Sequence, residues 1–144
     1  MITDLTTLFS NAQAITATAA STNIIDVGAA GTIYGYSAAI SRDVGKGADI
    51  PNRITVVQSF NNLTNMVITI EDSVDAAFTS PVIVATAPTY LLADLQTGAK
   101  LLLPERLPTN TNLRYVRLKY TITGTAPTLG QMTAGVTAGN QTNV

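Results

Sequence analysis

The 144-residue sequence has no histidine and no cysteine, and these two absences exclude a large part of enzyme chemistry. Ser–His and Cys–His nucleophilic systems cannot be assembled, and neither can disulfides or thiolate zinc sites. An enzyme would have to use carboxylates alone or a lysine with a shifted pKa. The nine acidic residues are scattered along the chain without a paired-acid signature. We therefore expect no enzyme activity, no catalytic residues, no metal site and no cofactor.

The one acidic cluster in the sequence consists of Glu71, Asp72 and Asp75, directly after an alternating apolar segment. Its spacing does not match an EF-hand calcium loop, which needs a central glycine and a terminal glutamate. We interpret the cluster as a solvated turn in which Asp72 and Ser73 make local hydrogen bonds.

Charged residues are also scarce, at 12% of the chain, whereas an average soluble domain has about 25%. The net charge is −1 and the sequence pI is about 5.1. This balance gives no attraction to phosphate backbones or acidic membranes, so we expect neither nucleic acid nor membrane as a partner. A surface so poor in charge fits a protein that is covered by protein partners. The alternative is a Thr-rich β-sandwich that is simply soluble.

No segment reads as a transmembrane helix, because the uncharged run 76–93 contains Pro81 and Pro88 and several Ser and Thr residues. No basic residue precedes Arg42, so the basic region of a secretory leader is missing. We expect synthesis and use in the cytoplasm, unless the protein leaves the cell inside or on a particle.

The clearest pattern that is present is the alternation of the segment 113–124. One face of this predicted strand carries Val116, Leu118, Tyr120 and Ile122, and the other carries Tyr115, Arg117, Lys119 and Thr121. Such a strand is buried on one face and presented on the other. Arginine with tyrosine on a presented face is typical of protein interfaces, although lysine can also serve to keep an edge strand soluble. We take Tyr115, Arg117 and Lys119 as candidate partner-binding residues.

Similar short segments, separated by Gly, Pro and Asn turns, follow one another along the chain and predict about eight to ten strands. The expected fold is all-β, an antiparallel β-sandwich, jelly roll or barrel, with one domain over residues 13–137 and a flexible tail over 138–144. The strands predicted at 53–60 and 65–71 are separated by Asn61-Asn62 and are expected to form a hairpin.

Residues 1–12 are predicted to form a short helix or an extended arm. Leu5, Leu8 and Phe9 have i, i+3, i+4 spacing, and Asp4 is placed to cap the start. A helix of two turns is not stable alone, so the segment packs on its own domain or docks on a partner. We take Asp4, Leu5, Leu8 and Phe9 as a second set of candidate contact residues.

Four segments together resemble the capsid cement (decoration) proteins of short-tailed bacteriophages. They are residues 1–16 (MITDLTTLFSNAQAIT), 21–28 (STNIIDVG), 67–78 (VITIEDSVDAAF) and 107–130 (LPTNTNLRYVRLKYTITGTAPTLG). The resemblance implies a jelly-roll-like β-sandwich, paired as a homodimer, on the outer surface of an icosahedral virion. There it would bridge major capsid protein subunits and stabilise the shell, after assembly in the cytoplasm of a bacterial host. The family has no catalytic residues to carry over.

Two other functions fit the same composition. A receptor- or glycan-binding jelly roll would need exposed aromatic residues over a shallow pocket, and aromatics make up only 6% of the chain with no tryptophan. A minor head–tail structural protein would differ mainly in its copy number per particle.

Overall fold

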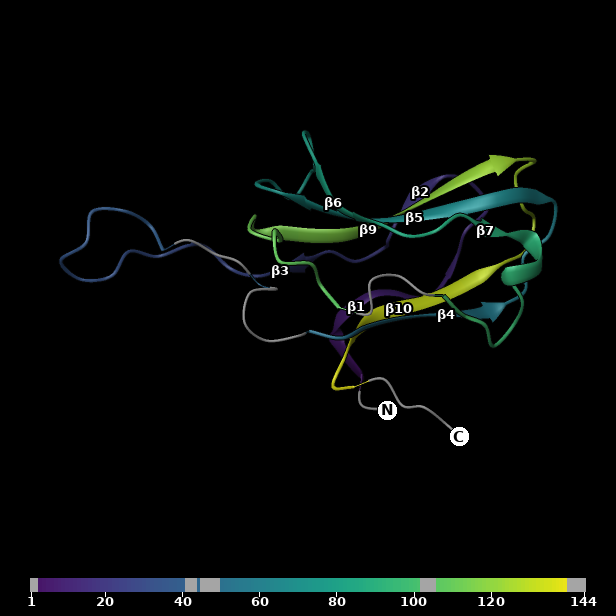
Figure 1. Ribbon diagram of the computed structural model, residues 1–144, viewed down its shortest axis with the longest axis horizontal. Helices are drawn as coiled ribbons and strands as arrows, with labels where there is room; N and C mark the ends of the chain where they lie inside the picture. The colour runs from purple at the N-terminus through teal and green to yellow at the C-terminus, as the bar shows by residue number, and fades with distance from the viewer. Residues whose placement is uncertain (1–2, 41–43, 45–49, 102–105, 140–144) are drawn as a thin grey trace.

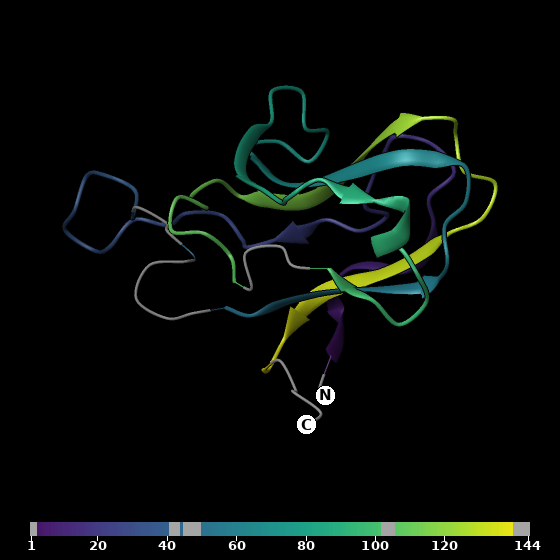
Figure 2. The same cartoon turned by 45° about the vertical axis from the view of Figure 1, so that its right-hand side comes forward.

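The computed structural model describes residues 3–40, 44, 50–101 and 106–139. Two antiparallel sheets pack face to face (Figures 1 and 2), and no α-helix occurs among the described residues. The first sheet, sheet A, contains β1 (Thr3–Ala14), β10 (Gln131–Thr137), β4 (Asn52–Gln58) and β8 (Lys100–Leu101), in that order. The second, sheet B, has the order β2 (Ala19–Ala20), β9 (Tyr115–Gly124), β5 (Leu63–Ser73) and β6 (Val82–Thr86), with β3 (Ile25–Asp26) on β9 and β7 (Tyr90–Leu91) on β5.

The chain crosses from one sheet to the other at most of its connections, which gives the jelly-roll order. The expected all-β antiparallel sandwich is therefore confirmed.

The expected hairpin is wrong, because β4 lies in sheet A and β5 in sheet B. Asn62 does adopt the left-handed conformation of a tight turn, with φ 64°, but this turn carries the chain across the sandwich.

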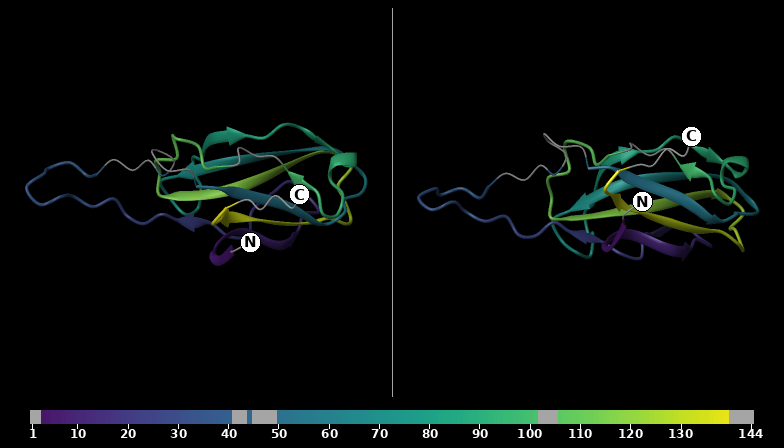
Figure 3. Two further views of the ribbon diagram at one scale, coloured as in Figure 1. Left: turned by 60° about the horizontal axis from the view of Figure 1, so that its bottom comes forward. Right: turned by 90° about the horizontal axis from the view of Figure 1, so that it is seen from below.

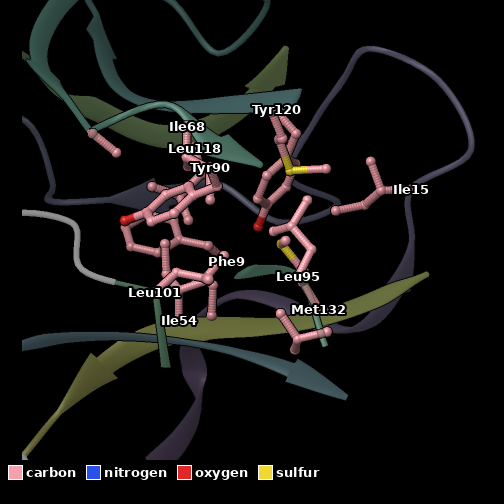
Figure 4. Close-up of a cluster of buried hydrophobic side chains, with 14 of the residues drawn as sticks. Phe9, Ile15, Ile54, Ile68, Tyr90, Leu95, Leu101, Leu118, Tyr120 and Met132 are labelled. Carbon is pink, nitrogen blue, oxygen red and sulfur yellow. The ribbon is translucent and has the colours of Figure 1, made fainter. Parts of the chain in front are cut away.

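The core lies between the two sheets, and both sheets contribute buried side chains to it (Figure 4). Phe9 of β1, Ile68 of β5, Tyr120 of β9 and Met132 of β10 are all buried there. The Tyr120 hydroxyl lies 2.8 Å from the Ser10 hydroxyl, which itself donates to Gln13 Oε1 at 2.6 Å. Since Ser10 has one proton to give, Tyr120 is the donor. This bond satisfies a buried hydroxyl and joins sheet B to sheet A.

The N-terminal segment is a strand and not a helix. β1 pairs along its length with β10, from Thr3 opposite Thr137 to Ala14 opposite Gln131. Its register shifts three times, which places the consecutive residues Leu8 and Phe9 both in the buried part of the sheet. The bulges account for the adjacent buried pair Leu8 and Phe9, whereas Leu5, the third residue of the helix-like spacing, is exposed.

Residues 28–40, which we call the tongue, extend from the end of β3 away from the sandwich (Figures 1 and 3). The tongue is a narrow ribbon, with a bridge between Thr32 and Ala39 and a turn closed by the Tyr36 N–H on the Ile33 carbonyl, 2.9 Å apart. The tongue projects along the long axis of the molecule in every view.

Of the tail predicted at 138–144, residues 140–144 lie outside the described residues, as do residues 1–2 of the N-terminal segment.

Candidate partner-binding face

The outer face of sheet B is built by β9 and β5, which pair side by side over ten residues of β9. The inward residues Val116, Leu118 and Tyr120 are buried, as expected from the alternation. Tyr115, Arg117 and Lys119 consequently point outward, where they lie opposite Ser73, Glu71 and Thr69 of β5. The structure thus brings the three predicted residues together on one face.

Glu71 is the centre of this face and is almost completely buried. Its side chain is 3% exposed, and its Oε2 accepts from Arg117 Nε and lies 2.8 Å from Arg117 Nη2. Lys119 Nζ lies 3.7 Å from Oε1 and remains 41% exposed. A carboxylate removed from water in this way needs a charged partner. Arg117, 18% exposed, is therefore mainly a structural partner for Glu71, while Lys119 keeps part of its charge in solvent.

Phe78 closes the other side of the Arg117 guanidinium. The ring is buried, and its centroid lies 4.1 Å from the guanidinium carbon, within range of a cation–π contact. Phe78 adopts φ 53°, and its N–H donates to the Asp75 carbonyl at 3.1 Å. The loop between β5 and β6 thus folds back over the sheet and shields the ion pair of Arg117 and Glu71.

Asp75 organises this loop from within. Its carboxylate accepts from the Thr79 N–H and the Thr79 hydroxyl at 3.2–3.3 Å, and from the Ser73 hydroxyl at 3.2 Å. Partial desolvation works to raise the pKa of Asp75, but the hydrogen bonds from Thr79 and Ser73 outweigh it and lower the pKa.

The acidic cluster is consequently not the solvated turn that the sequence predicted. Glu71 and Asp72 lie inside β5 and are both buried, on opposite sides of the strand. Asp72 Oδ2 accepts from the N–H groups of Asn112 and Leu113 at 3.2 Å each, which attaches the segment before β9 to β5. Among the described residues, no group of three or more acidic side chains could hold a metal ion.

Tyr115 lies at the edge of the same face, beside a second ion pair. The Arg114 guanidinium carbon is 4.9 Å from the centroid of the Tyr115 ring. Arg114 donates to both carboxylate oxygens of Asp26, at 2.9 and 2.8 Å, and these bonds raise the pKa of Arg114. The pair is exposed, so it contributes little to stability, but it joins β3 to the residue before β9, close to where the tongue begins.

The structure separates the N-terminal candidates into two groups. Leu8 and Phe9 are buried in the sandwich, so the expectation that they dock on a partner is wrong. Asp4 and Leu5 remain exposed and stay candidates. A hydrogen bond from the Thr6 N–H at 2.9 Å lowers the pKa of Asp4.

Glu71, Phe78 and Asp26 were not selected from the sequence as members of a site. The signal that was available is the pairing of β5 with β9, because two adjacent apolar alternations place Glu71 opposite Arg117 once the register is known. The register itself depends on contacts 46 residues apart along the chain, which no local pattern contains.

Comparison with protein families identifies the family to which the chain belongs. The model of the Bbp16 family matches residues 9–136, which span both sheets. The chain belongs to the Bbp16 family. Bbp16 is a phage-associated family, so the chain is a phage-type protein. No curated protein matches it. No helix within the described part of this Bbp16 protein is long and apolar enough to span a membrane.

Proposed function

We propose that this Bbp16-family protein is a structural virion protein that binds the outer surface of an icosahedral phage capsid and bridges neighbouring major capsid subunits. The observation that carries the proposal is the extent of the family match, from Phe9 in β1 to Val136 in β10. The match covers the folded sandwich and not one short motif. The phage association of the family therefore applies to the whole sandwich domain.

The chemistry of the surface supports a binding role without catalysis. Only 12% of the residues are charged, and on the outer face of sheet B two of the charges, Arg117 and Glu71, neutralise each other. Tyr115 and Lys119 at this face, with Asp4 and Leu5 on β1, are our candidates for contact with the capsid. Weak contacts of this kind suffice on a lattice, because many copies held at fixed spacing act together.

We propose further that the protein pairs as a homodimer through the edge of sheet B. β6 is the last strand of this sheet among the described residues, and its segment VIVAT contains no charge and no proline. Val82 and Ile83 are more than half exposed. Such an edge readily pairs with another strand, and antiparallel pairing of β6 with its own copy across a two-fold axis is self-complementary.

Copy number on purified particles tests the function. Quantitative mass spectrometry against the major capsid protein is expected to give a simple lattice fraction, on the order of hundreds of copies per particle. About a dozen copies or fewer would instead place the protein at the head–tail junction, the second of the alternative functions. Absence from particles would refute a structural role in the virion.

The same particles allow a test of the face. Capsids stripped of the protein are incubated with purified wild type, with Lys119→Ala and with Lys100→Ala, which removes a lysine from β8 in the other sheet. Lys119→Ala is expected to lower occupancy while Lys100→Ala leaves it unchanged. Equal occupancy by all three proteins would remove Lys119 from the contact.

A further inference from the structure

The tongue is the least explained feature of the fold, because it contributes no side chain to the core cluster. It extends beyond the sandwich in every view (Figures 1 and 3). Residues 28–34 lead from the sandwich to the tip, and at about 3.3 Å per fully extended residue their reach is at most on the order of 20 Å. When the sandwich sits on a partner's surface, the tip of the tongue can therefore contact that surface outside the footprint of the sandwich.

Residues before and after the tongue are hydrogen-bonded to the sandwich. On the outgoing leg, the Val27 N–H donates to the Arg114 carbonyl at 2.9 Å, and the Arg114 side chain holds Asp26. After the tongue in sequence, the Val44 N–H donates to the Thr111 carbonyl at 3.0 Å. The sandwich thus sets the direction in which the tongue points.

The tip of the tongue is apolar and exposed. Tyr34 is fully exposed, and Ile33 and Tyr36 are each more than half exposed. Gly35, at φ 80°, makes the turn between the two tyrosines. The two legs consist almost entirely of Gly, Ala, Ser and Thr, so the ribbon behind the tip is thin. A thin stem with a bulky apolar tip has a shape that fits a narrow cleft.

The composition of the tongue restricts its partner. Residues 27–41 contain no acid, base or side-chain amide. Nucleic acid and acidic lipid surfaces are recognised by basic side chains, and sugars by carboxylates and amides beside an aromatic ring. The tongue has the aromatic rings of Tyr34 and Tyr36 but none of the basic, carboxylate or amide side chains.

The backbone of the tongue favours protein over lipid. Among the described residues, the backbone of the tongue is paired across the ribbon at the Thr32–Ala39 bridge, where the Ile40 N–H donates to the Gly31 carbonyl, and at the turn, where the Tyr36 N–H donates to the Ile33 carbonyl. Hydrocarbon cannot satisfy open N–H and C=O groups, whereas a protein cleft can pair them by strand addition. Exposed tyrosines are also common anchors of protein interfaces.

We propose that the tongue is an anchor that inserts into an uncharged, apolar cleft between two neighbouring subunits of the capsid, with Tyr34, Tyr36 and Ile33 buried in it. The inference rests on the proposed function and adds a contact separate from the outer face of sheet B. The tip lies beyond the sandwich, and in this proposal it reaches a subunit next to the one beneath the sandwich. The tongue thereby supplies the bridging contact.

Binding of the full-length protein to stripped capsids tests this assignment. The double variant Tyr34→Ala/Tyr36→Ala is expected to raise the apparent Kd by at least ~30-fold, as the loss of an interface hot spot does. Its Tm is expected to stay that of the wild type, since both rings are exposed. The matched control is Leu91→Ala/Leu129→Ala, which truncates two exposed leucines on the sandwich and is expected to change the Kd by no more than about 2-fold.

Charge at the tip tests the nature of the cleft. Tyr34→Asp and Tyr34→Lys are both expected to weaken binding, because either charge would be buried without a partner. If one of them binds as tightly as the wild type, the cleft carries the opposite charge and the proposed uncharged partner is wrong.

The outcomes separate the two proposals. A wild-type protein that does not bind stripped capsids overturns the proposed function, and the anchor with it. Wild-type binding that the double tyrosine variant retains overturns the anchor alone. Tyrosine-dependent flotation with phosphatidylcholine vesicles, or tyrosine-dependent self-association without capsids, would assign the tongue to a bilayer or to a second copy and overturn the capsid cleft.

Discussion

At the scale of single residues, Glu71 decides how the outer face of sheet B is built. Its carboxylate is buried between Arg117, Lys119 and the loop that carries Phe78. Such an ion pair does not by itself indicate high stability, because both charges lose their hydration. It does specify one arrangement of β5, β9 and the loop, since Glu71 cannot be buried in another register without its cations.

We predict that the two cations of this face differ in their effect on stability. Arg117→Ala leaves Glu71 buried with only the more distant lysine and is expected to lower the free energy of unfolding by about 3 kcal/mol. Lys119→Ala removes a half-exposed charge and is expected to cost within ~1 kcal/mol. Urea denaturation measures both variants. A larger loss for Lys119→Ala than for Arg117→Ala would contradict this division of roles.

The hydroxyl of Tyr120 gives a prediction for alkaline pH. Burial raises its pKa to about 12, and burial raises the pKa of Tyr90 to about 12 as well. A tyrosine with a raised pKa binds its proton more tightly in the folded state. Its stabilisation is therefore complete below the ordinary value of 10 and is lost as the pH rises from 10 to about 12.

The matched variant Tyr120→Phe isolates this effect. At pH 7 it loses the bond to Ser10 and is expected to be less stable by about 0.5–1.5 kcal/mol. Between pH 10 and 12 it is expected to lose stability less steeply than the wild type, while Tyr90 still contributes. Parallel stability curves for the two proteins over this pH range, measured by urea denaturation, would show that Tyr120 does not titrate with unfolding.

At the scale of elements, the sequence predicted regular strands well and irregular strands poorly. β9 obeys strict alternation, and its buried and outward residues are those expected. β1 was predicted as a helix or arm, because its bulges break the period of two that identifies a strand. Glu71 was predicted in a solvated turn, because its partner Arg117 becomes its neighbour only through the pairing of distant strands.

The attachment of β1 to β10 is close enough to be tested by one methyl group. A Cβ added at Gly135 would lie 2.7 Å from Leu8 Cδ2 and 2.9 Å from Leu8 Cα. Gly135→Ala is therefore expected to push β1 away from the sheet and to cost about 1–3 kcal/mol. Urea denaturation gives the loss, and hydrogen exchange is expected to show faster opening of β1.

Gly31→Ala in the tongue is the control for this change. No atom lies within 4 Å of the added Cβ, and Gly31 is not in the left-handed region. The substitution is expected to be neutral or to stabilise by up to about 1 kcal/mol, because alanine has less freedom in the unfolded chain. Equal losses at the two positions would show that the contact with Leu8 is not what limits Gly135.

At the scale of the whole molecule, the described part of the jelly roll leaves three regions exposed besides Asp4 and Leu5 on β1. These are the outer face of sheet B with Lys119, the tongue with its tyrosines, and the edge strand β6. The sequence predicted the sandwich and the first of these regions, since both follow from alternation. It could not separate the tongue from an ordinary strand, because isolated apolar residues in a Gly- and Ala-rich segment carry no sign of whether a sheet covers them.

The edge strand gives the last prediction, which concerns assembly. Ile83→Lys places a charge on the exposed edge of β6, where pairing with a second copy would bury it, and a lysine at an edge opposes such pairing. The wild type is expected to run as a dimer in size-exclusion chromatography with light scattering, and Ile83→Lys as a monomer with an unchanged Tm. Leu129→Lys, an equally exposed leucine outside the strands, is expected to remain a dimer. A dimer that survives Ile83→Lys would place the two-fold contact elsewhere, and a monomeric wild type would mean that the capsid lattice alone brings two copies together.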